Sequence, residues 1–145
     1  MRVAAAFDHA GVPLRDTVLD AIAAAGQEVV DLGTDDDYPD SALKAGRAVL
    51  GGEAERAIVV CGSSAGVAVA ACKLRGIRAA TGHDHYTAAQ CVTHDNCNVL
   101  CLGARVVGPA IAAESVAAFL AASFSGEERH VRRLKKLDDI ERIGE

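Results

Sequence analysis

The chain has 145 residues, of which 50% are apolar and 3% aromatic, and its formal net charge is −5. The length suits one domain with an ordinary core, which Ala and Val must supply because the chain contains no Trp. The negative charge argues against a nucleic-acid partner, and no apolar stretch is long and uncharged enough to span a membrane.

Short apolar runs alternate with helix-like stretches along the whole chain. One stretch rich in Asp lies between the second apolar run and the helix-like stretch that follows it. The predicted elements, in chain order, are a strand over 2–7, a helix over 13–25, a strand over 28–32, a loop over 35–39, a helix over 41–50, a strand over 57–60, a helix over 67–73, a strand over 77–81, a helix over 86–93, a strand over 99–102 and a helix over 110–122 that follows Pro109.

Strands that alternate with helices imply βαβ units with right-handed crossovers. The fold class we expect is α/β, a Rossmann-like three-layer α/β/α sandwich with a parallel sheet of about five strands, in one domain over residues 1–145. The first residues run directly into a strand pattern without the segments of a signal peptide, so we expect a cytoplasmic protein.

The tail over 127–143 is highly charged and predicts an amphipathic helix. This helix follows a complete α/β unit, so it can pack on a partner subunit or on its own domain. Its charged face is either simply solvated or binds an anion. Arg129 and Arg133 are four residues apart and share one helical face, a spacing that suits a phosphate. The apolar stripe consists of Val131, Leu134, Leu137 and Ile140.

Cys61 ends an apolar run of β-branched residues and opens a turn of small residues over 62–66, after which a helix is predicted. This order places a thiol at the carboxyl end of a strand, where open α/β sheets bind ligands. The first N–H groups of the helix then point at the same spot and favour an anion such as a thiolate. Cys61 is therefore either a base or nucleophile, or a small buried residue that closes a core strand.

Other polar residues also fall at strand ends. Asp8 and His9 follow the first strand, where Asp8 can either act on a ligand or cap the next helix. His94 lies just before the fifth strand and Arg105 just after it. A histidine titrates near neutrality, so His94 is either a general acid or an ordinary loop residue. His83 and His85 are further loop candidates with less behind them, and because they start a predicted helix the interpretation favours a capping or solvent role.

The five cysteines form no CxxC pair, and their odd number argues against a disulfide framework. A zinc site from His94, Cys97 and Cys101 has no recognised spacing, so we predict no metal and no cofactor. A thiol base, a nearby histidine, backbone donors and several arginines together favour proton transfer on a small phosphorylated substrate.

These residues also carry a family resemblance that runs from Arg2 to the C-terminal helix. The chain resembles ribose-5-phosphate isomerase B and, more broadly, the family that also includes galactose-6-phosphate isomerase. The motifs that carry the resemblance are Asp8-His9-Ala10-Gly11, Asp37-Tyr38-Pro39, Cys61-Gly62-Ser63, Gly76-Ile77-Arg78-Ala79, Asn98-Val99-Leu100, Leu102-Gly103-Ala104-Arg105 and Arg129-His130.

The resemblance implies an aldose–ketose isomerase, most simply of ribose 5-phosphate, that works through an enediolate. Cys61 would be the general base and His94 the acid that helps to open the sugar ring. The family's sites are shared between subunits, which implies a homodimer or else a tetramer. The implied substrate-binding residues are Asp8 and His9 for hydroxyls, Gly62, Ser63, Ser64, Ala65 and Gly66 for the enediolate, Arg105, Arg129 and Arg133 for the phosphate, and Tyr38 and Asp95 beside the sugar.

The chain departs from the family pattern at three positions that the resemblance places along the sugar. Ser64 replaces a glycine of the usual Thr-Gly-x-Gly turn, Cys72 replaces an asparagine, and Asp95 replaces the asparagine of a His-Asn pair. The loop over 33–38 is also shorter than is common. These changes leave open a tetrose or hexose phosphate such as galactose 6-phosphate as the substrate.

Two other kinds of protein remain to be weighed. A phosphatase or transferase would use Cys61 as a nucleophile, but a phosphatase loop needs an arginine six residues later, and that position is Val67. A non-catalytic sugar-phosphate-binding paralogue would have no need of Cys61 and His94, both of which are present.

Overall fold

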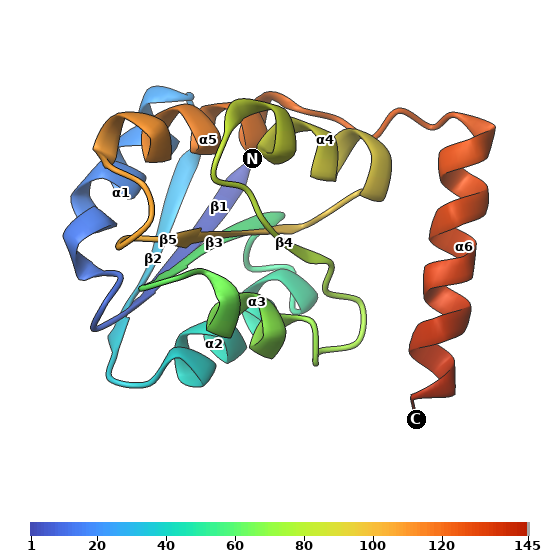
Figure 1. The fold of residues 1–145 in the computed structure, drawn as a ribbon, viewed down its shortest axis with the longest axis horizontal. Coiled ribbons are helices and arrows are strands. Elements are labelled where there is room, and N and C mark those ends of the chain that lie inside the picture. Colours follow the sequence, from blue (N-terminus) through green and yellow to red (C-terminus); the bar gives the residue numbers. More distant parts are fainter. Residues whose placement is uncertain (145) are drawn as a thin grey trace.

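The computed structural model describes residues 1–144 and contains one parallel five-stranded sheet (Figure 1). The strands lie side by side in the order β2-β1-β3-β5-β4. Their bounds are β1 Arg2–Asp8, β2 Glu28–Asp35, β3 Arg56–Cys61, β4 Ala79–Thr81 and β5 Val99–Gly103. A 3-10 turn (Val12–Leu14) precedes α1, and the helices are α1 Arg15–Ala24, α2 Tyr38–Leu50, α3 Ala65–Ala71, α4 His85–Asp95, α5 Pro109–Ala121 and α6 Glu128–Ile143.

The helices cover both faces of the sheet, with α1, α4 and α5 on one side and α2 and α3 on the other (Figure 1). Side chains along β1 alternate between the two cores. Val3, Ala5 and Phe7 pack under the first group of helices, while Ala4 and Ala6 pack under the second. Because both faces are covered, β1 is buried from Val3 to Asp8 and carries no alternating polar residues. The predicted α/β three-layer sandwich is confirmed.

The second strand and the second helix are both longer than the sequence pattern indicated. β2 continues past Gly33 to Asp35, and its pairing with β1 shifts register there, so this glycine marks a bulge and not a strand end. The next helix begins at Tyr38, not at residue 41, and Pro39 occupies its first turn, where a proline costs no hydrogen bond. The predicted loop is therefore reduced to Asp36 and Asp37.

A third difference changes the position of His94. The predicted polar loop at 94–95 is the last turn of α4, which ends at Asn96 in a left-handed conformation. The residues that follow enter β5 at Val99, which pairs with Ala57 at the beginning of β3. His94 therefore lies at the amino edge of the sheet, whereas Cys61 and its partner Gly103 lie at the carboxyl edge.

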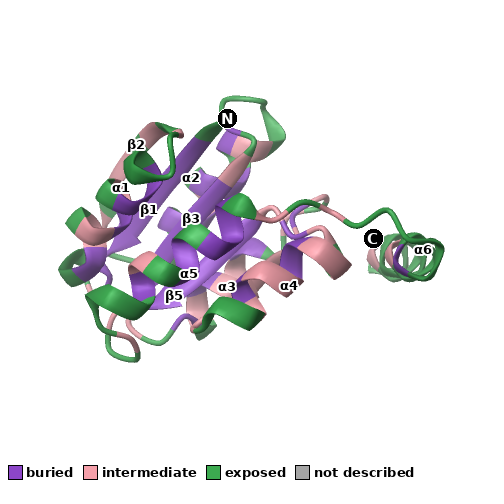
Figure 2. Ribbon diagram, turned by 90° about the horizontal axis from the view of Figure 1, so that it is seen from above, coloured by how far each residue is buried: buried purple, intermediate pink, exposed green. Residues whose placement is uncertain are grey.

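The C-terminal helix α6 stands away from the sandwich at the end of an extended linker (Figures 1 and 2). Only His130 of this helix is buried. Most of its predicted apolar stripe is exposed, including Val131, Leu137 and Ile140. No helix within residues 1–144 is both long and apolar enough to cross a membrane.

Candidate active site

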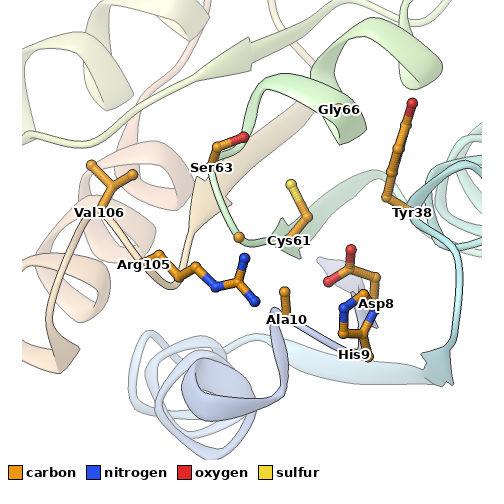
Figure 3. A pocket seen from close by; sticks show the side chains of 10 residues that line it. Asp8, His9, Ala10, Tyr38, Cys61, Ser63, Gly66, Arg105 and Val106 are labelled. Atoms are coloured by element: carbon orange, nitrogen blue, oxygen red, sulfur yellow. The ribbon is translucent and has the colours of Figure 1, made fainter.

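A pocket of about 400 Å³ opens at the carboxyl ends of β1 and β3. The chain leaves β1 towards α1 on one face of the sheet and leaves β3 towards α3 on the other face. This divergence is the topological switch point at which open α/β sheets bind ligands. We call this cavity the Cys61 pocket, and its lining is drawn in Figure 3: Asp8, His9, Ala10, Tyr38, Cys61, Gly62, Ser63, Gly66, Arg105 and Val106.

The turn after β3 supplies the centre of the pocket. Cys61 is 4% exposed and is the only one of the five cysteines that lines it. The backbone N–H groups of Ser63 and Gly66 have no acceptor within residues 1–144, and that of Ala65 is bound by the Ser63 hydroxyl. The thiol thus lies beside free backbone donors, an arrangement suited to a substrate that develops negative charge.

Asp8 and His9 enter the pocket from the end of β1. Asp8 is buried, and one carboxylate oxygen accepts the N–H of Gly11 at 2.8 Å, so the side chain shapes the turn as well as facing the cavity. The Nδ1 atom of His9 lies 2.8 Å from the carbonyl oxygen of Asp36. A carbonyl only accepts hydrogen bonds, so Nδ1 carries a proton and Nε2 is left for a ligand.

Arg105 reaches the pocket from the loop after β5 and points its guanidinium group towards Cys61 and Ala10 (Figure 3). The loop is held in place because Ala104 and Arg105 donate their N–H groups to the carbonyls of Cys61 and Gly62, at 2.8 and 2.9 Å. Arg105 makes no ion pair with any other residue of the described chain. An unpaired cation beside the thiol can bind an anionic substrate group.

Tyr38 forms the wall of the pocket that faces the start of α3. The Tyr38 ring packs against Gly66. A Cβ atom added to Gly66 would lie only 3.0 Å from two carbons of that ring. Gly66 therefore allows the tyrosine to close this side of the cavity.

Four of the predicted site residues, His94, Asp95, Arg129 and Arg133, are placed elsewhere in the same chain. His94 lines a separate groove on α4, and its ring stacks on that of His130 from α6 with centroids 4.0 Å apart. Arg129 precedes His130 and is paired with Glu127 at 2.9 Å, and Arg133 is exposed one turn further along α6. Burial lowers the pKa of His130, and the neighbouring His94 lowers it further, so the stack is favoured when His130 is neutral.

Two of the residues that depart from the family pattern also lie outside the Cys61 pocket. Cys72 and Asp95 line a groove of about 590 Å³ between the sandwich and α6. Ser64 and Ala65 belong to the turn after β3 but do not line the cavity. The family resemblance placed Cys72 and Asp95 along the sugar, and within one chain these two residues are separate from the Cys61 pocket.

The sequence interpretation did not single out three contributors to the site. Ala10 and Val106 line the pocket directly after His9 and Arg105 in the sequence. This adjacency to predicted site residues was the sign in the sequence that could have pointed to them. His83 was assigned a capping or solvent role, but its Nε2 atom accepts the N–H of Gly103 at 2.9 Å. No cluster of three or more His, Cys, Asp or Glu side chains suited to a metal ion occurs among residues 1–144.

Comparison with known proteins agrees with this architecture. The family model described as Ribose/Galactose Isomerase matches residues 3–137. Ribose-5-phosphate isomerase B of Escherichia coli is 37% identical, covering 97% of this chain and 96% of the relative. D-erythrulose-4-phosphate isomerase of Pectobacterium atrosepticum is also 37% identical, over 87% and 86% of the two chains.

The solved structure of ribose-5-phosphate isomerase B from Clostridium thermocellum superposes with a TM-score of 0.94 at 40% identity, over the full length of both chains. A parallel sheet with a thiol pocket at its switch point defines an α/β enzyme of small-molecule metabolism. The chain belongs to the ribose/galactose isomerase family.

Proposed function

We propose that this chain is an aldose–ketose isomerase that interconverts ribose 5-phosphate and ribulose 5-phosphate. The observation that carries the proposal is the position of Cys61 at the switch point, beside free backbone donors and the unpaired Arg105. Membership of the family and the names of its members support the same reaction class. We place the reaction in the cytoplasm, in line with the sequence expectation.

In the proposed reaction the open-chain sugar lies along the turn after β3. The Cys61 thiolate takes the proton from C2 of the aldose, which gives an enediolate with the negative charge on O1. The proton of the C2 hydroxyl then passes from O2 to O1, and the Cys61 thiol returns its proton to C1, which leaves the carbonyl group at C2 and regenerates the thiolate. The negative charge of the enediolate between these steps is bound by the N–H groups of the turn, which need no reorganisation. Asp8 and the free Nε2 of His9 hold the hydroxyl groups of the sugar.

The acid and two of the phosphate ligands are proposed to come from a second subunit. His94 stacks on His130 of α6, and Arg129 and Arg133 lie close to this stack. The stack lies at the opposite edge of the sheet from Cys61. A single chain therefore holds two incomplete halves of the predicted site. Two chains in a symmetric dimer would complete both sites if α6 of each reached the Cys61 pocket of the other.

The surroundings of α6 support such a homodimer. The helix exposes Leu137 and Ile140 towards the groove of about 590 Å³, whose opposite wall includes Ile77 and Ala79. The Glu141 carboxylate accepts the N–H of Gly76 at 2.9 Å, so the helix is tethered at both ends while its apolar face stays uncovered. Unpartnered apolar surface of this kind is typical of protein–protein contacts, which supports the proposed dimer.

A tetrose phosphate is the second candidate substrate. It is favoured by the similarity to an isomerase named for D-erythrulose 4-phosphate, which matches as closely in identity as a ribose-5-phosphate isomerase B does. The Cys61 pocket itself carries the thiol and the donors that either sugar would need.

The test compares wild-type protein with Cys61→Ser on ribose 5-phosphate, ribulose 5-phosphate and tetrose and hexose phosphates. A positioned base contributes roughly 10²–10⁴-fold, so Cys61→Ser should lose about that factor in kcat. Cys72→Ser, which changes a thiol outside the pocket, is the matched control and should keep its turnover. Near-normal turnover by Cys61→Ser would refute the assignment of the base, and a wild type inactive on every sugar phosphate would refute the function.

A further inference from the structure

Ser64 forms the back of the turn that shapes the Cys61 pocket. Its neighbours Cys61, Gly62, Ser63 and Gly66 line the cavity, whereas Ser64 has no exposed surface at all. Its hydroxyl points away from the cavity and is hydrogen-bonded to the hydroxyl of Thr81 at the end of β4, with the two oxygens 2.6 Å apart. Within the described residues this is the only hydrogen bond that the Ser64 hydroxyl makes.

The backbone of Ser64 adopts a conformation that side chains disfavour. Its φ angle is +76°, in the left-handed region where the Cβ of an L-residue crowds the following carbonyl oxygen. Within residues 1–144 the only other non-glycine residue with positive φ is Asn96, a residue type that tolerates this region and often ends helices. A serine stays in this conformation only where the surrounding structure holds it.

Thr81 is well placed to hold the turn. It is paired with Cys101 of β5, and β5 is paired with β3, which carries Cys61. The β-branched side chain of threonine has few accessible rotamers, so its hydroxyl is presented from a fixed strand in a fixed direction. The hydrogen bond therefore connects the turn to the same sheet that positions the thiol.

We infer that Ser64 and Thr81 are positioning residues, whose hydroxyl pair keeps the turn after Cys61 in the geometry that binds the enediolate. The inference rests on the proposed isomerase function. Where a glycine would adopt the left-handed conformation unaided, this chain uses a serine that must be held there from β4. Loss of the Thr81 hydroxyl would release the turn and move the N–H groups of Ser63 and Gly66 relative to the substrate.

The experiment is a double-substitution cycle of Thr81→Val and Ser64→Gly, assayed by steady-state isomerisation of ribose 5-phosphate. Misplacement of donors that act on the transition state lowers kcat more than it raises KM, so Thr81→Val should lose roughly tenfold in kcat with KM within about twofold. In the Ser64→Gly background the same Thr81→Val change should alter kcat by less than about twofold, because glycine needs no support.

Two further variants separate positioning from general stability. Thr81→Ser keeps the hydroxyl and should retain turnover. Thr34→Val makes the matched change on β2, the opposite edge strand, at an exposed residue outside the pocket, and should leave kcat unaltered. Normal kcat in Thr81→Val, or an equal loss in both backgrounds, would overturn the inference.

A failure of the proposed function is distinguishable from a failure of the inference. If the wild type interconverts no sugar phosphate, the function is refuted while the hydroxyl pair can still be tested by crystallography. A crystal structure of Thr81→Val should then show residue 64 in a different backbone conformation from the wild type. Retention of the left-handed conformation with an unmoved turn would overturn the inference independently of activity.

Discussion

At the scale of single residues, the site depends on close backbone contact between the ends of β3 and β5. A Cβ on Gly103 would lie 2.7 Å from the Ser63 carbonyl carbon and 2.9 Å from the Gly62 carbonyl oxygen. Neither atom belongs to a flexible side chain, so the turn itself would have to shift. The absence of a side chain at Gly103 therefore contributes directly to the geometry around Cys61.

Gly103→Ala should therefore damage both stability and turnover. Overpacking of this kind costs about 1–3 kcal/mol in the free energy of unfolding, and displacement of the turn should lower kcat by more than roughly tenfold. Denaturant unfolding and steady-state kinetics measure the two effects. Gly108→Ala is the control, because a Cβ there meets nothing within 4 Å. Equal behaviour of the two alanine variants would contradict this account of the contact.

His83 should make this part of the structure sensitive to pH. Its Nε2 accepts the Gly103 N–H only when the ring is neutral, and burial lowers the pKa of His83 in the folded protein despite the opposing effect of Asp84. The unfolded chain then binds protons more readily than the folded chain, so this stabilisation is complete above about pH 6.5 and is lost as the pH falls towards the folded pKa.

Melting temperatures of the wild type and of His83→Gln between pH 5 and pH 8 provide the measurement. The glutamine amide oxygen can accept the same N–H without titrating, so the variant should lose less stability than the wild type on acidification. Burial also lowers the pKa of His130, so this histidine makes stability depend on pH in the same direction. Because His130 is present in both proteins, its effect cancels in the comparison. Parallel curves for the two proteins would exclude a contribution from His83.

At the scale of elements, α6 carries the arginines that we propose as phosphate ligands. Arg133 is exposed and has no ion-pair partner within residues 1–144, whereas Arg129 is already paired with Glu127. Arg133→Ala should raise KM for ribose 5-phosphate by roughly 10–100-fold, since a hydrogen bond to a charged group contributes about 1.5–3 kcal/mol. Arg132→Ala, the neighbouring charge on another face of α6, is the control. An equal rise in KM for both variants would indicate general charge attraction instead of a specific contact.

The elements also show what the sequence could predict. The alternation of apolar runs with helix-like stretches gave the α/β sandwich and its five strands, because the three central strands β1, β3 and β5 are buried on both faces and read as continuous apolar runs. It also led to Asp8, Cys61 and Arg105, because each of them follows a strand and the carboxyl ends of parallel strands meet at one edge.

A role for His94 in the site could not be predicted in the same way. The residue precedes β5, so strand direction alone sends it to the amino edge, and its proposed role then depends on a second chain that no single-sequence pattern contains. The support of the turn by Thr81 and His83 was likewise hidden, because both bonds join residues about 20 positions apart whose partners depend on strand order.

At the scale of the whole molecule, the proposed dimer with shared sites would give a reason why α6 extends away from its own sandwich. A helix that covered its own apolar groove would bury Leu137 and Ile140, but it would leave its arginines at the wrong edge of the sheet. The exposed apolar stripe of α6 and the unpaired Arg133 are both explained if α6 packs on a second copy of the chain and places Arg133 in the Cys61 pocket of that copy.

Subunit complementation tests this arrangement. In a mixed dimer of Cys61→Ala with the double variant Arg129→Ala and Arg133→Ala, one site lacks both the thiol and the two arginines, and the other site is intact. Random exchange makes half of the dimers mixed, so activity should recover to about a quarter of the wild-type value. His94 stacks on His130 of α6, so His94→Ala should complement Cys61→Ala but not the arginine variant. Subunits that exchange, as shown by mass spectrometry of the mixed dimer, and yet stay inactive would place the thiol and the arginines in the same chain and refute the shared site.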